Sequence, residues 1–188
     1  MRQSREAVRA AKSWQNNVTM REGGQWPDVL IEKVECPARR DLMWTIKPLI
    51  AAMDDKGRAI VHDVWFNGTW YTSDGKYWET YRTPEKKPAI GCGDGPMLVS
   101  NARLFADLDE VIGKGEIKPG PKMTENGFDC TWWDLARAAG GPPDYTVCIG
   151  TSDHLPQVVR SRENGHEYTY TLSQWNTASV GLPPELSR

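Results

Sequence analysis

The 188-residue sequence lacks any apolar run long enough to cross a membrane as a helix, because its longest apolar runs are a handful of residues. It also lacks an excess of charge of one sign, since 23 basic and 25 acidic residues are mixed along the chain. No global field therefore favours nucleic acid or an anionic membrane, and we expect no nucleic-acid partner. The N-terminus shows no signal peptide, and we expect that a signal peptide or lipid anchor has been removed.

The sequence also lacks the motifs of common catalytic and cofactor sites. It has no Gly-x-Gly-x-x-Gly after a strand, no phosphate loop ending in Lys-Ser or Lys-Thr, and no Gly-x-Ser-x-Gly elbow. Its three histidines, His62, His154 and His166, lie far apart in the chain, and no cysteine belongs to a Cys-x-x-Cys pair. We therefore expect no cofactor, no metal site and no catalytic residue.

Four cysteines are present: Cys36, Cys92, Cys130 and Cys148. Cys130 and Cys148 fall in two predicted strands whose connecting loop, rich in glycine and proline, could bring them side by side. Cys36 and Cys92 each lie beside loop-forming residues, a common setting for a cross-link between loops. We predict the disulfides Cys36–Cys92 and Cys130–Cys148, which would indicate a periplasmic or extracellular protein. The alternative is four free buried thiols in a cytosolic protein.

The C-terminal quarter of the chain predicts three short strands in succession, over residues 145–149, 157–162 and 167–173. Turn-forming sequences separate them. Because side chains alternate across a strand, Tyr168 and Tyr170 share one face of the last strand, and its threonines share the other. The pattern predicts an antiparallel meander with one apolar and one polar face.

This order of elements resembles the C-terminal half of the LolA-like lipoprotein carriers and their LppX/LprG-type relatives in bacterial envelopes. The resemblance lies in a turn, a later Ser-x-aromatic-Asn segment and a terminal proline, matched here by Asp153, Leu155, Pro156, Ser173, Trp175, Asn176 and Pro183. An aromatic hairpin in the middle of the chain also resembles that family, through Gly68, Tyr71, Gly75 and Trp78. The resemblance implies a curved sheet around helices, with an apolar cavity between them.

The rest of the chain predicts further strands and two helices. The strands are expected over residues 29–35, 40–46, 58–66, 69–72, 77–78 and 127–133. One helix is predicted over residues 4–13, and a second over residues 101–112, where apolar residues form a continuous stripe. The predicted fold is α+β: a single LolA-like domain, residues 1–188, in which a strongly curved antiparallel β-sheet, a half-barrel, wraps over two or more helices.

We hypothesise a non-catalytic envelope protein that binds a lipid, an acyl chain or a lipidated protein in an apolar cavity between sheet and helix. The resemblance alone implies transport. Its partners would be the lipid or acyl-chain ligand and a lipoprotein or membrane component, and the protein would be a monomer. The residues predicted to line the cavity are apolar positions of strands and of the second helix: Trp44, Ile60, Val64, Phe66, Leu104, Phe105, Leu108, Tyr168 and Tyr170.

The nine tryptophans leave a second class of function open, because stacked tryptophans can bind sugars as well as fill cores. The alternative is a secreted carbohydrate-binding module or hydrolase that uses exposed tryptophans and scattered carboxylates. An interaction domain without a small ligand is a third possibility. Co-purified lipid would favour the carrier, and affinity for saccharides would favour the alternative.

Overall fold

The computed structural model describes residues 1–21, 29–37, 39–46, 59–81, 116–125, 127–136, 144–163 and 166–187. Within these ranges the chain forms one α-helix, eleven β-strands and a short 3-10 helix: α1 (Arg2–Ala10), β1 (Ser13–Arg21), β2 (Val29–Glu35), β3 (Arg39–Ile46), β4 (Ala59–Phe66), β5 (Thr69–Ser73), β6 (Trp78–Tyr81), β7 (Glu116–Glu125), β8 (Phe128–Ala136), β9 (Tyr145–Gly150), β10 (Pro156–Glu163), β11 (His166–Ser173) and η2 (Pro184–Leu186).

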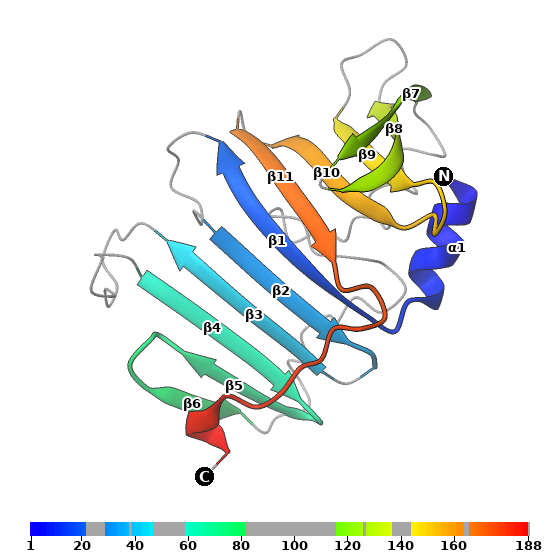
Figure 1. Ribbon diagram of the computed structural model, residues 1–188. Coiled ribbons are helices and arrows are strands. Elements are labelled where there is room, and N and C mark those ends of the chain that lie inside the picture. The colour runs from blue at the N-terminus through cyan, green and yellow to red at the C-terminus, as the bar shows by residue number, and fades with distance from the viewer. Residues whose placement is uncertain are drawn as a thin grey trace.

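All eleven strands belong to one antiparallel sheet, in the order β6-β5-β4-β3-β2-β1-β11-β10-β9-β8-β7 (Figure 1). The first and last strands of the chain are neighbours at its centre, where Val18 of β1 pairs with Tyr170 of β11. Two sequential meanders, β1 to β6 and β7 to β11, are therefore joined by a pairing that links the ends of the chain. The predicted C-terminal meander is confirmed as β9-β10-β11.

The half-barrel prediction is wrong in its curvature, because the sheet is neither closed nor strongly curled. The two strands at its ends, β6 and β7, do not pair with each other. Strand β7 contains Pro119 and Pro121, which lack the N–H needed to donate to a further strand, and prolines of this kind suit a sheet edge. The strong curvature was implied by the family resemblance and not by the residues themselves.

The helix predictions are met in part. The N-terminal helix is present but runs from Arg2 to Ala10, because the backbone is extended at Ala11, with φ −66° and ψ 133°. It is the one α-helix in the part of the chain that the structure describes, where two or more were expected. The second predicted helix, over residues 101–112, lies outside the described residues.

The aromatic hairpin in the middle of the chain folds as its turn sequence predicts. Asn67 and Gly68 have φ values of 49° and 92°, as the central residues of the two-residue turn between β4 and β5. Glycine adopts such a φ without a steric penalty, and asparagine tolerates it better than most residues. The turn sets the register in which Phe66 pairs with Thr69 and Trp65 with Trp70.

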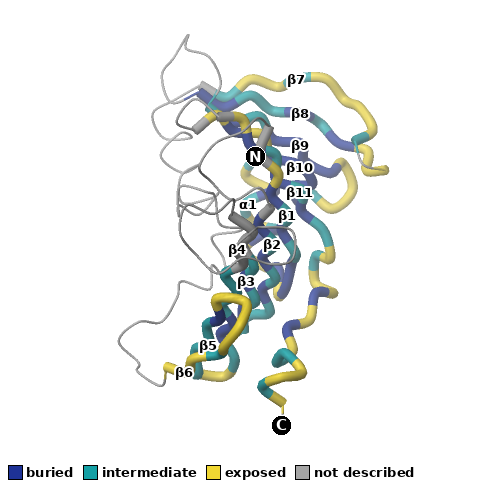
Figure 2. Tube along the Cα trace, turned by 90° about the vertical axis from the view of Figure 1, so that its left-hand side faces the viewer, coloured by how far each residue is buried: buried dark blue, intermediate teal, exposed yellow. Residues whose placement is uncertain are grey.

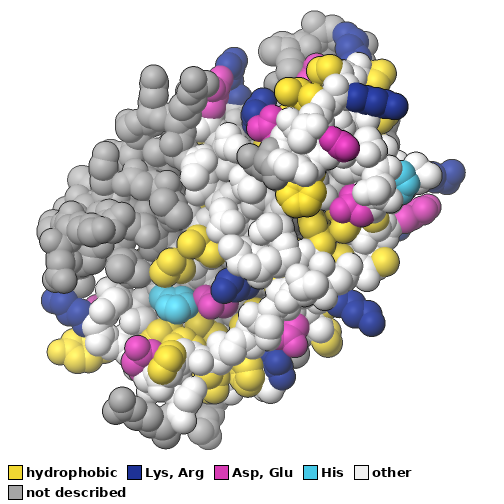
Figure 3. Space-filling model, viewed as in Figure 1, with side chains coloured by type: hydrophobic (Ala, Val, Ile, Leu, Met, Phe, Trp, Pro, Cys, Tyr) yellow, Lys and Arg dark blue, Asp and Glu magenta, His cyan; other side chains and the backbone are white. Residues whose placement is uncertain are grey.

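The two faces of the sheet differ in character. The face that carries Val18, Tyr170 and the residues paired with them is called the core face. The opposite face, crossed by the C-terminal segment (residues 174–187), is called the tail face. Buried positions recur along β1 and β9 to β11, whereas β7 and the β5–β6 hairpin are mostly half-buried or exposed (Figure 2). The tail face is in view in Figure 3, where acidic, basic and apolar side chains are interspersed.

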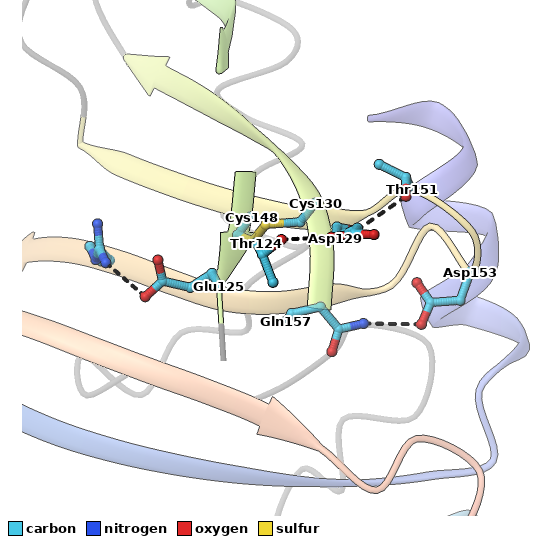
Figure 4. The surroundings of a disulfide bond; sticks show 9 residues. Thr124, Glu125, Asp129, Cys130, Cys148, Thr151, Asp153 and Gln157 are labelled. Atoms are coloured by element: carbon cyan, nitrogen blue, oxygen red, sulfur yellow. Dashed lines mark hydrogen bonds and ion pairs between the residues drawn. A yellow bond between two sulfur atoms is a disulfide. The ribbon is translucent and has the colours of Figure 1, made fainter. Parts of the chain in front are cut away.

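Gly150, at the end of β9, offers a test of the turn that leads into β10. A Cβ at this position would overlap Oδ1 of Asp153. The Asp153 carboxylate cannot simply rotate away, because it accepts a hydrogen bond from the Gln157 side chain at 3.0 Å (Figure 4). It also accepts one from the Leu155 N–H at 3.0 Å. We expect Gly150→Ala to lower the free energy of unfolding by about 1 to 3 kcal/mol. Gly181→Ala is the matched control, because nothing lies within 4 Å of its added Cβ.

Denaturant titration of both variants measures this effect. Equal stability of the Gly150→Ala variant and the native protein would show that the turn accommodates the methyl group without losing its hydrogen bonds.

Candidate functional site

The core face is apolar across the C-terminal meander, as the alternation of its residues predicts. Tyr168, Tyr170 and Leu172 of β11 are at most 1% exposed, whereas Thr169 and Thr171 between them are half-buried. The same layer continues through strands on both sides of β11 and includes Val8 of α1. Its buried members are Val8, Val18, Leu30, Leu42, Leu135, Tyr145, Val147, Ile149, Leu155, Val159, Tyr168, Tyr170 and Leu172.

A charged pair interrupts this apolar layer. Nε of Arg40 donates to Oε1 of Glu32 at 2.9 Å, with the side chains 9% and 0% exposed. Asn16, which pairs with Glu32 in the sheet register, is fully buried as well. Sequence reasoning did not identify this pair. The signal was available, because the alternation of β2 puts Glu32 on the same face as Leu30 and Val34.

The predicted cavity-lining residues divide between the two faces of the sheet. Tyr168 and Tyr170 lie on the core face. The unbroken register from β11 through β1, β2 and β3 to β4 puts Val64 and Phe66 on the tail face. Val64 is fully buried there, and the Arg39 guanidinium lies 4.6 Å from the centre of the Phe66 ring. The structure therefore does not bring these two pairs of residues together.

Two further predicted lining residues lie in neighbouring strands of the sheet. Trp44 of β3 pairs with Leu30 and Val61, and Ile60 of β4 pairs with Thr45. Leu104, Phe105 and Leu108 lie outside the described residues. Ligand contact by any member of the predicted set stays a prediction.

The Cys130–Cys148 disulfide predicted from the sequence is confirmed. The two cysteines lie on adjacent strands, β8 and β9, with their Cα atoms 5.6 Å apart (Figure 4). They are fully buried in a small cluster with Trp132 and Val158, on the tail face. Cys36 is disulfide-bonded too. Its predicted partner Cys92 lies outside the described residues, so that pairing stays a prediction.

The C-terminal segment is held to the tail face by Glu35. Its Oε2 accepts the backbone N–H of Val180 at 3.0 Å, and Nη1 of Arg39 donates to both carboxylate oxygens at 3.1 and 3.2 Å. The Val180 N–H, followed by the charge and hydrogen bonds of Arg39, lowers the pKa of Glu35 below its ordinary value of 4.5. These contacts all favour the ionised carboxylate.

A lowered pKa in the folded state makes this anchor acid-sensitive. Its stabilisation is present above the unfolded pKa and is lost as the pH falls through the folded pKa. Because the Glu35 side chain is 32% exposed, we expect a contribution below about 1 kcal/mol. The amide resonance of Val180, followed by NMR from pH 7 to pH 2, should shift with the titration of Glu35. Glu35→Gln should abolish that shift, and Glu167→Gln, in an exposed pair with Arg162, should leave it unchanged.

Between the C-terminal segment and the sheet lies a groove of about 480 Å³. Its sheet side is formed by Asp41, His62, Ser73 and Trp78, on four neighbouring strands, and its other side by residues 181–185. Nε2 of His62 lies 2.7 Å from Oδ1 of Asp41, and the His62 and Trp78 rings meet edge to face, with their centres 5.0 Å apart. Sequence reasoning missed this groove, because it depends on where the C-terminal segment crosses the sheet.

Two other kinds of site are absent from the described residues. They contain no group of three or more His, Cys, Asp or Glu side chains arranged to hold a metal ion. None of their helices has the length and apolar character needed to cross a membrane.

Neither a protein-family model nor a curated protein sequence matches this chain. Solved structures do match it in fold. LprF from Mycobacterium bovis matches over 97% of this chain and 93% of its own, with 16% sequence identity and a TM-score of 0.64. The lipoprotein LppX from Mycobacterium tuberculosis matches over 97% and 95%, with 10% identity and a TM-score of 0.56. The chain therefore shares the fold of LprF and LppX, in agreement with the LppX/LprG-type resemblance of its sequence.

Proposed function

We propose that the protein is a non-catalytic envelope protein that holds a lipid, an acyl chain or the acyl chain of a lipidated protein against the core face of its sheet. The observation that carries the proposal is the apolar layer of that face, which continues from β3 across to β8. The fold shared with LprF and the lipoprotein LppX supports it. Tyr168 and Tyr170 would form part of the floor of the site, with Trp44 three strands away in the register row of Tyr170. Leu104, Phe105 and Leu108 would form the cover.

The energetics of such a site are sufficient for useful affinity. Each methylene group removed from water contributes roughly 0.8 kcal/mol. A chain that buries about ten methylenes would gain on the order of 8 kcal/mol, before the costs of ordering the ligand and the protein. Because this contribution does not depend on charge, binding should change little with salt.

An extracytoplasmic location is part of the proposal. The Cys130–Cys148 disulfide favours an oxidising compartment, such as the periplasm or the outside of the cell. A lipid or a lipidated protein is available as a ligand in the same compartment.

Lipid uptake tests the proposal directly. The purified full chain is extracted for lipid and titrated with a fluorescent fatty acid at low and high salt. We expect uptake of the acyl ligand at both salt concentrations. No uptake of any acyl ligand would overturn the carrier function, and saccharide affinity in its place would favour the carbohydrate-binding alternative.

Val18 and Asn17 are neighbours in β1 that lie on opposite faces of the sheet, so substitutions at them test the two faces separately. Val18→Phe adds volume on the core face, whereas Asn17→Phe adds a similar ring on the other face. We expect Val18→Phe to weaken fatty-acid binding and Asn17→Phe to leave it unchanged, with overpacking at Val18 costing about 1 to 3 kcal/mol of stability. A folded Val18→Phe protein that binds as well as the native one would exclude the core face around β1 as the site.

A further inference from the structure

The groove between the C-terminal segment and the tail face has a distinct charge. Two of its lining residues are acidic: Asp41 on the sheet side and Glu185 in the first turn of η2. No lysine or arginine is among the described residues that line it. His62 is the remaining ionisable group, and it lies against Asp41. The described lining therefore holds two carboxylates and one imidazole, and Lys33, which pairs with Asp41 in the sheet register, is a basic neighbour of Asp41 on the same face.

The walls of the groove add an aromatic surface and a rigid frame. Trp78 contributes an indole ring, and tryptophan gives the strongest attraction to a cation among the aromatic residues. On the other wall, Pro183 and Pro184 lack N–H donors and fix their own φ angles. The Pro183 carbonyl accepts hydrogen bonds from the Leu186 N–H and the Ser187 hydroxyl, which hold the turn beneath Glu185 in place.

We propose that this groove binds an organic ammonium group. The cation lies against the Trp78 ring, between the carboxylates of Asp41 and Glu185, which supply opposite charge and hydrogen-bond acceptors. His62 holds the Asp41 carboxylate in place through their 2.7 Å contact. The site is on the opposite face from the acyl site proposed above, so it stands or falls independently of it.

The ammonium group that fits this groove is a lysine side chain of a partner protein. The amine of a lipid headgroup is the other source of such a cation. A headgroup brings a phosphate with its amine, and the groove has no lysine or arginine among its described lining residues to pair with that phosphate. Probes with and without the phosphate therefore distinguish the two sources.

The experiment uses the full chain, labelled with ¹⁵N, and follows the indole N–H resonance of Trp78, assigned from a Trp78→Phe variant. The probes are ethanolamine, O-phosphoethanolamine, the methyl ester of Nα-acetyl-lysine, and methyl glucoside as the neutral polyol. We expect saturable shifts with the ammonium probes, weakened by added salt because the groove is open to solvent. Tighter binding of the lysine ester than of O-phosphoethanolamine supports a lysine of a partner protein, and the reverse order would overturn that assignment.

Variants test the assigned contacts. Trp78→Leu removes the ring and should weaken ammonium binding about tenfold, followed on the backbone amide of Gly75 in the same groove. Glu185→Gln, at an exposed position, should weaken it roughly two- to fivefold. The matched controls are Tyr77→Ala and Glu79→Gln, which remove an aromatic ring and a carboxylate next to the groove but outside its lining. Both controls should bind like the native protein.

Three further results would overturn the assignment. The first is the absence of saturable shifts with any ammonium probe at concentrations up to about 0.1 M, well above the dissociation constant of a weak complex. The second is equal binding by the native protein and the Trp78→Leu and Glu185→Gln variants. The third is binding of methyl glucoside that is as tight as that of ethanolamine and insensitive to salt. Fatty-acid uptake is measured on the same variants. It should be unchanged, and failure of the acyl proposal would leave the ammonium result intact.

Discussion

Replacing Glu32 by leucine is expected to lower the free energy of unfolding by about 3 to 5 kcal/mol. The change leaves the Arg40 guanidinium in the apolar layer without the carboxylate that it meets at 2.9 Å. An arginine cannot lose its proton in a protein, so the buried charge persists. Arg40→Met should cost a similar amount near neutral pH, because it leaves the Glu32 carboxylate fully buried without its arginine.

The double variant Glu32→Leu/Arg40→Met distinguishes the cost of leaving one buried charge unpaired from the net contribution of the ion pair to stability. Buried ion pairs gain Coulomb energy but lose hydration, and their replacement by apolar residues of similar size is often neutral or stabilising. We expect the double variant to recover most of the loss seen in each single one. Denaturant titrations of the four proteins complete the cycle.

The coupling between the two side chains is the difference between the loss in the double variant and the sum of the two single losses. Additive losses in the double variant would contradict a direct coupling between the two side chains.

Local signals in the sequence were sufficient for most of the strands. The strand predicted over residues 29–35 agrees with β2, and the strands near 40–46, 58–66 and 145–149 end within a residue of β3, β4 and β9. In these segments the residues are apolar or β-branched on at least one face, so propensity and alternation agree. Their turns carry glycine or asparagine, which mark the strand ends.

Two strands were missed because their sequences oppose those rules. In β1 the core-facing positions include Asn16 between Trp14 and Val18, so the alternation of apolar residues is broken by a buried amide. In β7, Pro119 and the glycine after it are typical of a loop, and a register shift follows Pro119. The sheet tolerates them because β7 is a terminal strand of its order.

The grouping of Val64 with Tyr170 in one predicted site follows from the missed strand β1. Without it, no register connects the C-terminal meander to the strands that follow residue 29, so their apolar faces could be aligned in either way. A shift of one residue reverses every side chain of a strand. Val64 and Tyr170 were therefore grouped together, although the pairing through β1 puts them on opposite faces. Long-range pairing of this kind is not encoded in any local pattern.

Removal of the Cys130–Cys148 disulfide has the second large effect that we expect. The bond spans 18 residues of chain, and in the chain-entropy account a loop of this size contributes about 3 kcal/mol by restricting the unfolded state. The double variant Cys130→Ala/Cys148→Ala should lose about that amount, measured by denaturant titration without reductant. The disulfide at Cys36 stays intact in this variant.

Two mechanisms could produce this loss, and the denaturant slope distinguishes them. The cysteines are fully buried against Trp132 and Val158, so their replacement also removes packed atoms from the folded state. A packing loss lowers the midpoint without changing the slope of free energy against denaturant. Release of a constrained loop lets the unfolded chain expose more surface, and the slope should then rise as the midpoint falls. Val158→Ala, with the disulfide intact, is the matched packing control. An unchanged slope in the cysteine variant would show that packing, and not the loop constraint, accounts for its loss of stability.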